Sequence, residues 1–155
     1  MKGADQQQLI ENLKPSGAFV GASYGVLGLN LLLFIVGLWN AAIATIEAGF
    51  YFSTLCFGLF AAVSVQRAVR DKKEGLNVSA AYMGISYTAL ALAVLLMTVA
   101  LWNSPMELSE RGFYAVTFAA ALFSAITIQK NVRDEEAVNA ILTKTNKELN
   151  SVSTE

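Results

Sequence analysis

Four long stretches without a charged residue constrain this chain more than any other feature. A helix needs roughly 20 mostly apolar residues to cross a hydrocarbon layer of about 30 Å. The charge-free gaps run between Lys14 and Glu47, Glu47 and Arg67, Glu74 and Glu107, and Arg111 and Lys130. The apolar segments inside them, 19–38, 48–66, 80–101 and 112–129, are long enough to span a membrane. We therefore predict four transmembrane segments.

These segments are apolar on every side, which favours one fold class. Inside a bilayer only helices and closed barrels satisfy the backbone hydrogen bonds. Barrel strands alternate apolar and polar residues, whereas a run such as LNLLLFIVGLW does not. A soluble helical protein needs polar helix faces, but only 15% of the 155 residues are charged. The sequence predicts an all-α membrane protein with four transmembrane helices.

The second half of the chain repeats the first without a gap, at an offset of 63 positions. Each unit holds two crossings, so both copies share one orientation, as two tandem hairpins related by an axis along the membrane normal. The first segment has a counterpart in the third, which argues against a cleaved signal peptide. The predicted organisation is an N-terminal tail (1–18), a two-helix unit (19–71), a link (72–79), a second unit (80–134) and a C-terminal tail (135–155).

The candidate site residues are polar, aromatic and glycine positions that recur in both copies. They are Trp39, Asn40, Glu47, Gly49, Tyr51, Gln66, Arg70 and Asp71, and then Trp102, Asn103, Glu110, Gly112, Tyr114, Gln129, Arg133 and Asp134. The aromatic residues suit a headgroup boundary, and the glutamates suit the positive start of a helix. Thr45 and Ser109 are expected to cap those helices.

Positive charge predicts the orientation. Lysines and arginines gather in the link, after the fourth segment and before the first, whereas the two hairpin turns hold only Arg111. Positive loops stay cytoplasmic, so we expect both termini and the link inside the cell. Ion pairs are expected between Arg67 and Asp71, and between Lys130 and Asp134, each four apart. The basic residues either anchor the helix ends at anionic lipid, or Arg70 and Arg133 bind a phosphate or lipid headgroup.

Small residues recur at four-residue spacing, a pattern that lets transmembrane helices approach. The rows are Gly17, Gly21 and Gly25 with Ala80, Gly84 and Thr88, and Thr54, Gly58 and Ala62 with Thr117, Ala121 and Ala125. We expect the protein to self-associate through such rows. Gln66 and Gln129 continue the second pair of rows, either hydrogen-bonded to a neighbouring helix or as a polar step in a pathway.

Chemistry is sparse. There is no His and a single cysteine, Cys56, so the usual ligand sets for zinc or iron are absent and no histidine base is present. We expect no catalytic, cofactor-binding or metal-binding residue, and no enzymatic activity. A net charge of −1 predicts no nucleic-acid partner.

Both copies carry Trp-Asn, Glu-x-Gly-Phe-Tyr, Leu-Phe and Gln-Lys/Arg-x-x-Arg-Asp, over roughly residues 19–136. These motifs resemble the yiaAB two-helix domain of the bacterial YiaA/YiaB inner membrane proteins. The resemblance implies a multi-pass inner membrane protein and supplies no substrate. Two functions follow as hypotheses: a non-enzymatic structural or interaction module that self-associates in the bilayer, or a subunit of a small oligomeric transporter or channel.

Overall fold

The computed structural model describes residues 10–152, with side chains described for residues 10–147. This part of the chain forms four long helices: α2 (Gly17–Asn40), α3 (Thr45–Lys73), α4 (Ala80–Asn103) and α5 (Leu108–Val152). Each is long and apolar enough to cross a membrane, and the described residues contain no strand. The predicted fold class is therefore confirmed. Residues 1–9 and 153–155 of the predicted tails lie outside the described range.

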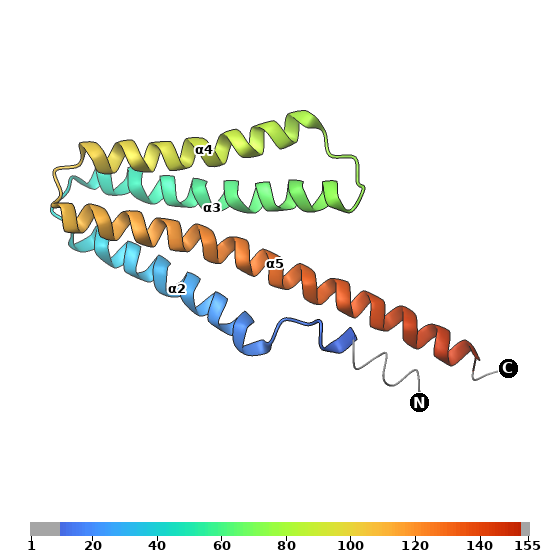
Figure 1. The fold of residues 1–155 in the computed structure, drawn as a ribbon. Coiled ribbons are helices and arrows are strands. Elements are labelled where there is room, and N and C mark those ends of the chain that lie inside the picture. Colours follow the sequence, from blue (N-terminus) through green and yellow to red (C-terminus); the bar gives the residue numbers. More distant parts are fainter. Residues whose placement is uncertain (1–9, 153–155) are drawn as a thin grey trace.

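The helices lie side by side in the order α4, α3, α5, α2 (Figure 1). Both short turns, 41–44 and 104–107, lie at one end of the bundle, which we term the turn end. The link between α3 and α4 and the start of α2 lie at the opposite end, the link end, and α5 runs on past it.

The main packing joins the two copies of the repeat. Helix α3 packs most extensively on α4, and α2 on α5, whereas α2 and α3 of the first copy barely touch. These two pairings are equivalent, because α4 repeats α2 and α5 repeats α3. The contact of α3 with α5 joins equivalent helices and so lies on the pseudo-twofold axis. Each copy thus finds its principal partners in the other copy.

Helices α3 and α5 bury the same face. The buried positions of α3 are Tyr51, Thr54, Leu55, Gly58, Ala61, Ala62, Val65 and Ala68. The positions 63 residues later in α5 are buried as well: Tyr114, Thr117, Phe118, Ala121, Ser124, Ala125, Ile128 and Asn131. A Cβ atom at Gly58 would lie 3.0 Å from the Phe118 ring. The missing side chain therefore allows the two helices to approach closely.

The lengths of α3 and α5 differ because only one copy carries a helix stop. Gly75 has φ +77°, a conformation that glycine adopts without steric cost. Around it the N–H of Leu76 donates to the Asp71 carbonyl at 2.9 Å, and the N–H of Gly75 to the Lys72 carbonyl at 3.3 Å. This bond pair is a Schellman motif that ends α3. Val138 occupies the equivalent position of the second copy, and α5 continues through it.

Candidate functional site

The repeated tryptophans lie at the turn end, at the last turn of α2 and α4. Trp39 is 89% exposed and Trp102 is 81% exposed. Neither ring packs into the bundle, so both are free to contact the surroundings of the protein. Amphipathic rings in this position are typical of the boundary between hydrocarbon and headgroups.

The repeated asparagines and glutamates bind backbone groups at the helix ends. The Asn40 amide donates to the Val36 carbonyl at 2.7 Å, and the Asn103 amide to the Val99 carbonyl at 2.8 Å. The Glu47 carboxylate accepts from the N–H of Ala44 at 3.2 Å. The Glu110 carboxylate accepts from the N–H of Glu107 at the same distance. Both glutamates thus satisfy a backbone donor at a helix start, as in a capping box.

The expected caps Thr45 and Ser109 are wrong. Ala44 is the N-cap of α3, and Thr45 and Ser109 lie within the first turns of α3 and α5. The glutamate side chains supply one half of a capping box, because each accepts from the N–H of the residue three positions before it. An alanine N-cap has no side-chain oxygen for the other half. Serine caps occur instead on the other two helices: Ser16 accepts from the N–H of Phe19, and Ser79 from the N–H of Tyr82. The constant offset between Ser16 and Ser79 is the signal that could have found them.

The repeated motifs meet across the copies at the turn end. A recess of about 350 Å³ is lined by Asn40 of the first copy with Glu110 and Tyr114 of the second. An equivalent recess of about 290 Å³ is lined by Asn103 with Glu47 and Tyr51. The Trp-Asn motif of one copy therefore lies beside the Glu-x-Gly-Phe-Tyr motif of the other. Gly49 and Gly112 take no part in close packing, because a Cβ atom at either would meet nothing within 4 Å.

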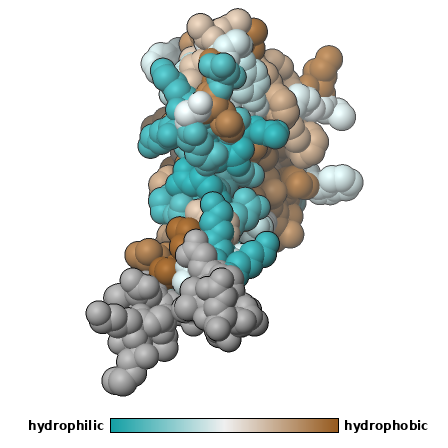
Figure 2. Space-filling model, turned by 90° about the vertical axis from the view of Figure 1, so that its right-hand side faces the viewer, coloured by the Kyte–Doolittle hydropathy of each residue, from teal (hydrophilic) through white to brown (hydrophobic). Residues whose placement is uncertain are grey.

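The remaining candidates lie at the link end, where hydrophilic side chains gather on part of the end face (Figure 2). A cavity of about 20 Å³, the size of one water molecule, is lined by Gln66, Arg67 and Arg70 with Gln129, Lys130 and Arg133. The two copies thus contribute the same three positions. Neither glutamine amide forms a hydrogen bond to another helix of this chain within residues 10–147, so both roles predicted for the glutamines stay predictions.

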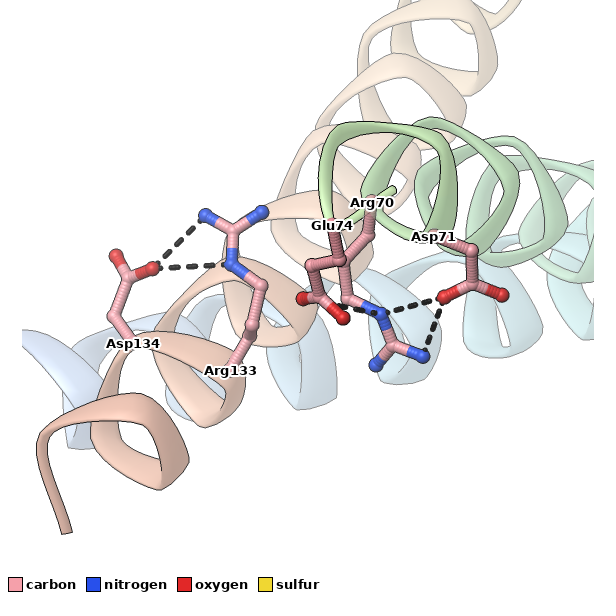
Figure 3. Close-up of polar contacts among 5 residues, drawn as sticks. All are labelled: Arg70, Asp71, Glu74, Arg133 and Asp134. Atoms are coloured by element: carbon pink, nitrogen blue, oxygen red, sulfur yellow. Dashed lines mark hydrogen bonds and ion pairs between the residues drawn. The ribbon is translucent and has the colours of Figure 1, made fainter. Parts of the chain in front are cut away.

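Each repeated arginine turns to the aspartate that follows it in its own helix (Figure 3). The Arg70 guanidinium lies 2.7 Å from the Asp71 carboxylate, and the Arg133 guanidinium lies 2.9 Å from the Asp134 carboxylate. Lys130 also contacts Asp134, at 2.7 Å, as expected. The expected Arg67–Asp71 pair does not form among the described residues, where Asp71 pairs with Arg70 alone. Such partly exposed pairs each contribute at most about 1 kcal/mol.

Two further polar groups were not singled out by the sequence. Asn131 is 2% exposed, and its amide donates to Ser23 of α2 at 3.3 Å, which joins the copies near the link end. Arg111 donates to the carbonyls of Met106 and Trp102 at 2.8 and 3.3 Å, and so holds the second turn. Within the described residues no group of His, Cys, Asp or Glu side chains is arranged to hold a metal ion.

Comparison with known proteins identifies the family of this chain. The model of the yiaA/B two-helix domain matches the chain twice, over residues 19–71 and 82–134. The chain belongs to the YiaA/YiaB family. It is 42% identical over 119 residues to the inner membrane protein YiaA of Escherichia coli (strain K12), an alignment that covers 77% of this chain and 82% of that protein. No solved structure matches the chain. With four spanning helices, this YiaA/YiaB member is a multi-pass inner membrane protein.

Proposed function

We propose that this family member is a non-enzymatic membrane module that self-associates in the bilayer, with both termini and the link on the cytoplasmic side. The observation that supports a structural role is the use made of the repeated polar side chains. Asn40, Glu47, Tyr51 and their counterparts lie at helix ends and between copies, and the Arg-Asp pairs hold one another. The bonds that these side chains make are internal to the protein, which favours a structural role.

The outward face of α2 supports self-association. Helix α2 is the least buried of the four within the bundle. A Cβ atom at Gly17, Gly21 or Gly25 would meet nothing within 4 Å, and the same holds for Gly84 of α4. These rows are therefore left open by the internal packing, unlike Gly58, which faces α5. A second copy of this chain is the partner that such a small-residue face would admit.

A pathway through the single bundle is not favoured by the packing. Phe34, Leu55 and Phe118 fill the centre, and Tyr51 stacks on Tyr114 near the turn end. Glu47 and Glu110 are exposed at the turn end, so neither places a carboxylate in the middle of the bundle. A transporter or channel would need its path between copies of the chain.

Native mass spectrometry of the purified protein in mild detergent and in lipid nanodiscs tests self-association. We expect a dimer or higher oligomer, which Gly21→Leu and Gly84→Leu weaken because leucine separates the helix backbones. Gly112→Leu is the matched control, since its Cβ position is equally open but lies outside the rows. Monomer alone in both environments, or equal weakening by the control, would refute this interface.

A further inference from the structure

An apolar groove with a cationic edge opens at the link end. It has a volume of about 640 Å³ and lies between α2, α3 and α5. Phe19 and Val26 of α2 and Phe123 of α5 form part of its apolar lining. Phe19 and Phe123 are exposed beyond half of their surface, so this lining faces the hydrocarbon of the bilayer. Lys73, Lys130 and Arg133 also line the groove.

The cations of this groove exceed the carboxylates that hold them. Asp134 pairs with Lys130 at 2.7 Å and with Arg133 at 2.9 Å. Lys73 forms no ion pair among residues 10–147. Three cations therefore line the groove beside an apolar surface, and one carboxylate pairs with two of them. Such an arrangement attracts an anion that carries a hydrocarbon chain.

The other copy provides an internal comparison. The residues equivalent to Lys130, Arg133 and Lys73 are Arg67, Arg70 and Glu136. Arg70 lies 2.7 Å from Asp71 and 3.9 Å from Glu74, and Glu136 interacts with its charge. Two cations there face three carboxylates. The cationic excess is therefore a property of one groove and does not follow from the repeat or from the helix ends in general.

We propose that the groove between α2, α3 and α5 binds one anionic phospholipid. Its phosphate lies among Lys73, Lys130 and Arg133, and an acyl chain lies along Phe19, Val26 and Phe123. Basic pockets between transmembrane helices bind anionic headgroups. The apolar lining favours a lipid over free phosphate, because an acyl chain makes apolar contacts that free phosphate cannot make. This inference is independent of self-association, because every lining residue comes from a single chain.

Native mass spectrometry of the purified full chain tests the proposal, with phosphatidylglycerol and phosphatidylcholine of identical acyl chains as the two probes. We expect one phosphatidylglycerol to bind in preference to phosphatidylcholine. Lys73→Glu reverses one charge and so changes the net charge of the groove by two units. At about fivefold per unit, the affinity for phosphatidylglycerol should fall roughly 25-fold. Lys72→Glu makes the same change in net charge at the neighbouring residue, which does not line the groove, and should change affinity less than about threefold.

A second variant tests the chain-binding half of the groove. Val26→Trp fills the apolar lining and leaves every charge in place, and it should also weaken the binding of phosphatidylglycerol to the groove. Thermal unfolding checks that each variant remains folded. Equal binding of the two lipids, equal weakening by Lys72→Glu and Lys73→Glu, or full competition by sn-glycerol 3-phosphate would overturn the proposal; the last result would assign a site for free phosphate.

Discussion

Tyr51 and Tyr114, which occupy equivalent positions of the two copies, stack on each other across the pseudo-twofold axis. Their ring centroids are 6.1 Å apart and their planes differ by 18°. The rings of Phe34 and Tyr114 form a T-shaped pair with centroids 5.3 Å apart, and the Tyr51 hydroxyl donates to the Ala100 carbonyl at 2.9 Å. The stack therefore couples α3 and α5 to α2 and α4.

The hydroxyls of the two tyrosines are expected to contribute differently to the free energy of unfolding. Tyr51→Phe removes the bond to Ala100 and should lower the free energy of unfolding by about 1 kcal/mol. Tyr114→Phe should cost less, because its hydroxyl makes no hydrogen bond among the described residues. Unfolding in mixed micelles with rising dodecyl sulfate content measures both. Equal losses would contradict this asymmetry.

Gly58 is expected to tolerate no larger side chain. Gly58→Leu places new atoms against the ring of Phe118 and the side chain of Leu122, and should destabilise the bundle by about 1–3 kcal/mol. The same unfolding assay measures the loss, with Gly49→Leu as the control because that position is open. Adding Phe118→Ala should recover part of the loss in a double-mutant cycle. If Phe118→Ala recovered none of the lost stability, Gly58 would not pack against Phe118 at the α3–α5 contact.

Gly75 is expected to be needed for its backbone conformation. Gly75→Ala puts a Cβ atom on a residue with φ +77° and should cost about 1–2 kcal/mol of stability. Gly84→Ala, within a helix and with open space around it, should instead be neutral or slightly stabilising. Thermal unfolding of the two variants compares them directly. An unchanged Gly75→Ala variant would show that the Schellman motif is dispensable.

Arg111 is expected to stabilise the second turn without acting on the first. Arg111→Met keeps most of the apolar stem and loses the bonds to Met106 and Trp102, at a cost of about 1–2 kcal/mol. Hydrogen exchange of the amides of residues 103–108 should increase, while exchange of residues 40–45 should not. Equal increases in both turns would indicate a global effect.

The proposed orientation predicts opposite accessibility for the two ends. In a Cys56→Ala background, Ala42→Cys at the turn end should react in intact spheroplasts with a thiol reagent that cannot cross lipid. Asn77→Cys in the link should react only after the membrane is opened. Ala119 stands at the position equivalent to Cys56, so the background substitution should be tolerated. The reverse pattern would invert the topology.

The spanning helices and the repeat could be predicted from the sequence because both are local or one-dimensional signals. Long apolar runs without charge force helices in a bilayer, and a gapless offset needs only comparison along the chain. Residue pairs such as Asn40 and Asn103, or Glu47 and Glu110, make the same bonds in both copies. Their repetition in sequence therefore became repetition in structure.

The partners of each helix could not be predicted in the same way. The face that carries Tyr51 and Gly58 can be recognised as a packing face, but its pattern does not say which helix covers it. Pairing α3 with α2 or with α4 gives an antiparallel contact in either case. The choice depends on how side chains fit in three dimensions, as at Gly37, where a Cβ atom would lie 2.9 Å from the Phe113 ring.

Because each copy packs mainly on the other copy, residues 74–79 only connect the two copies along the chain. Cutting this connection removes no principal contact between helices. Two separately expressed halves should then recombine into the same four-helix body, while either half alone would be left with its largest interface bare. A duplication in this arrangement amounts to a dimer joined into one polypeptide. Joined halves no longer have to be identical, which permits one side to keep Lys73 while the other carries Glu136.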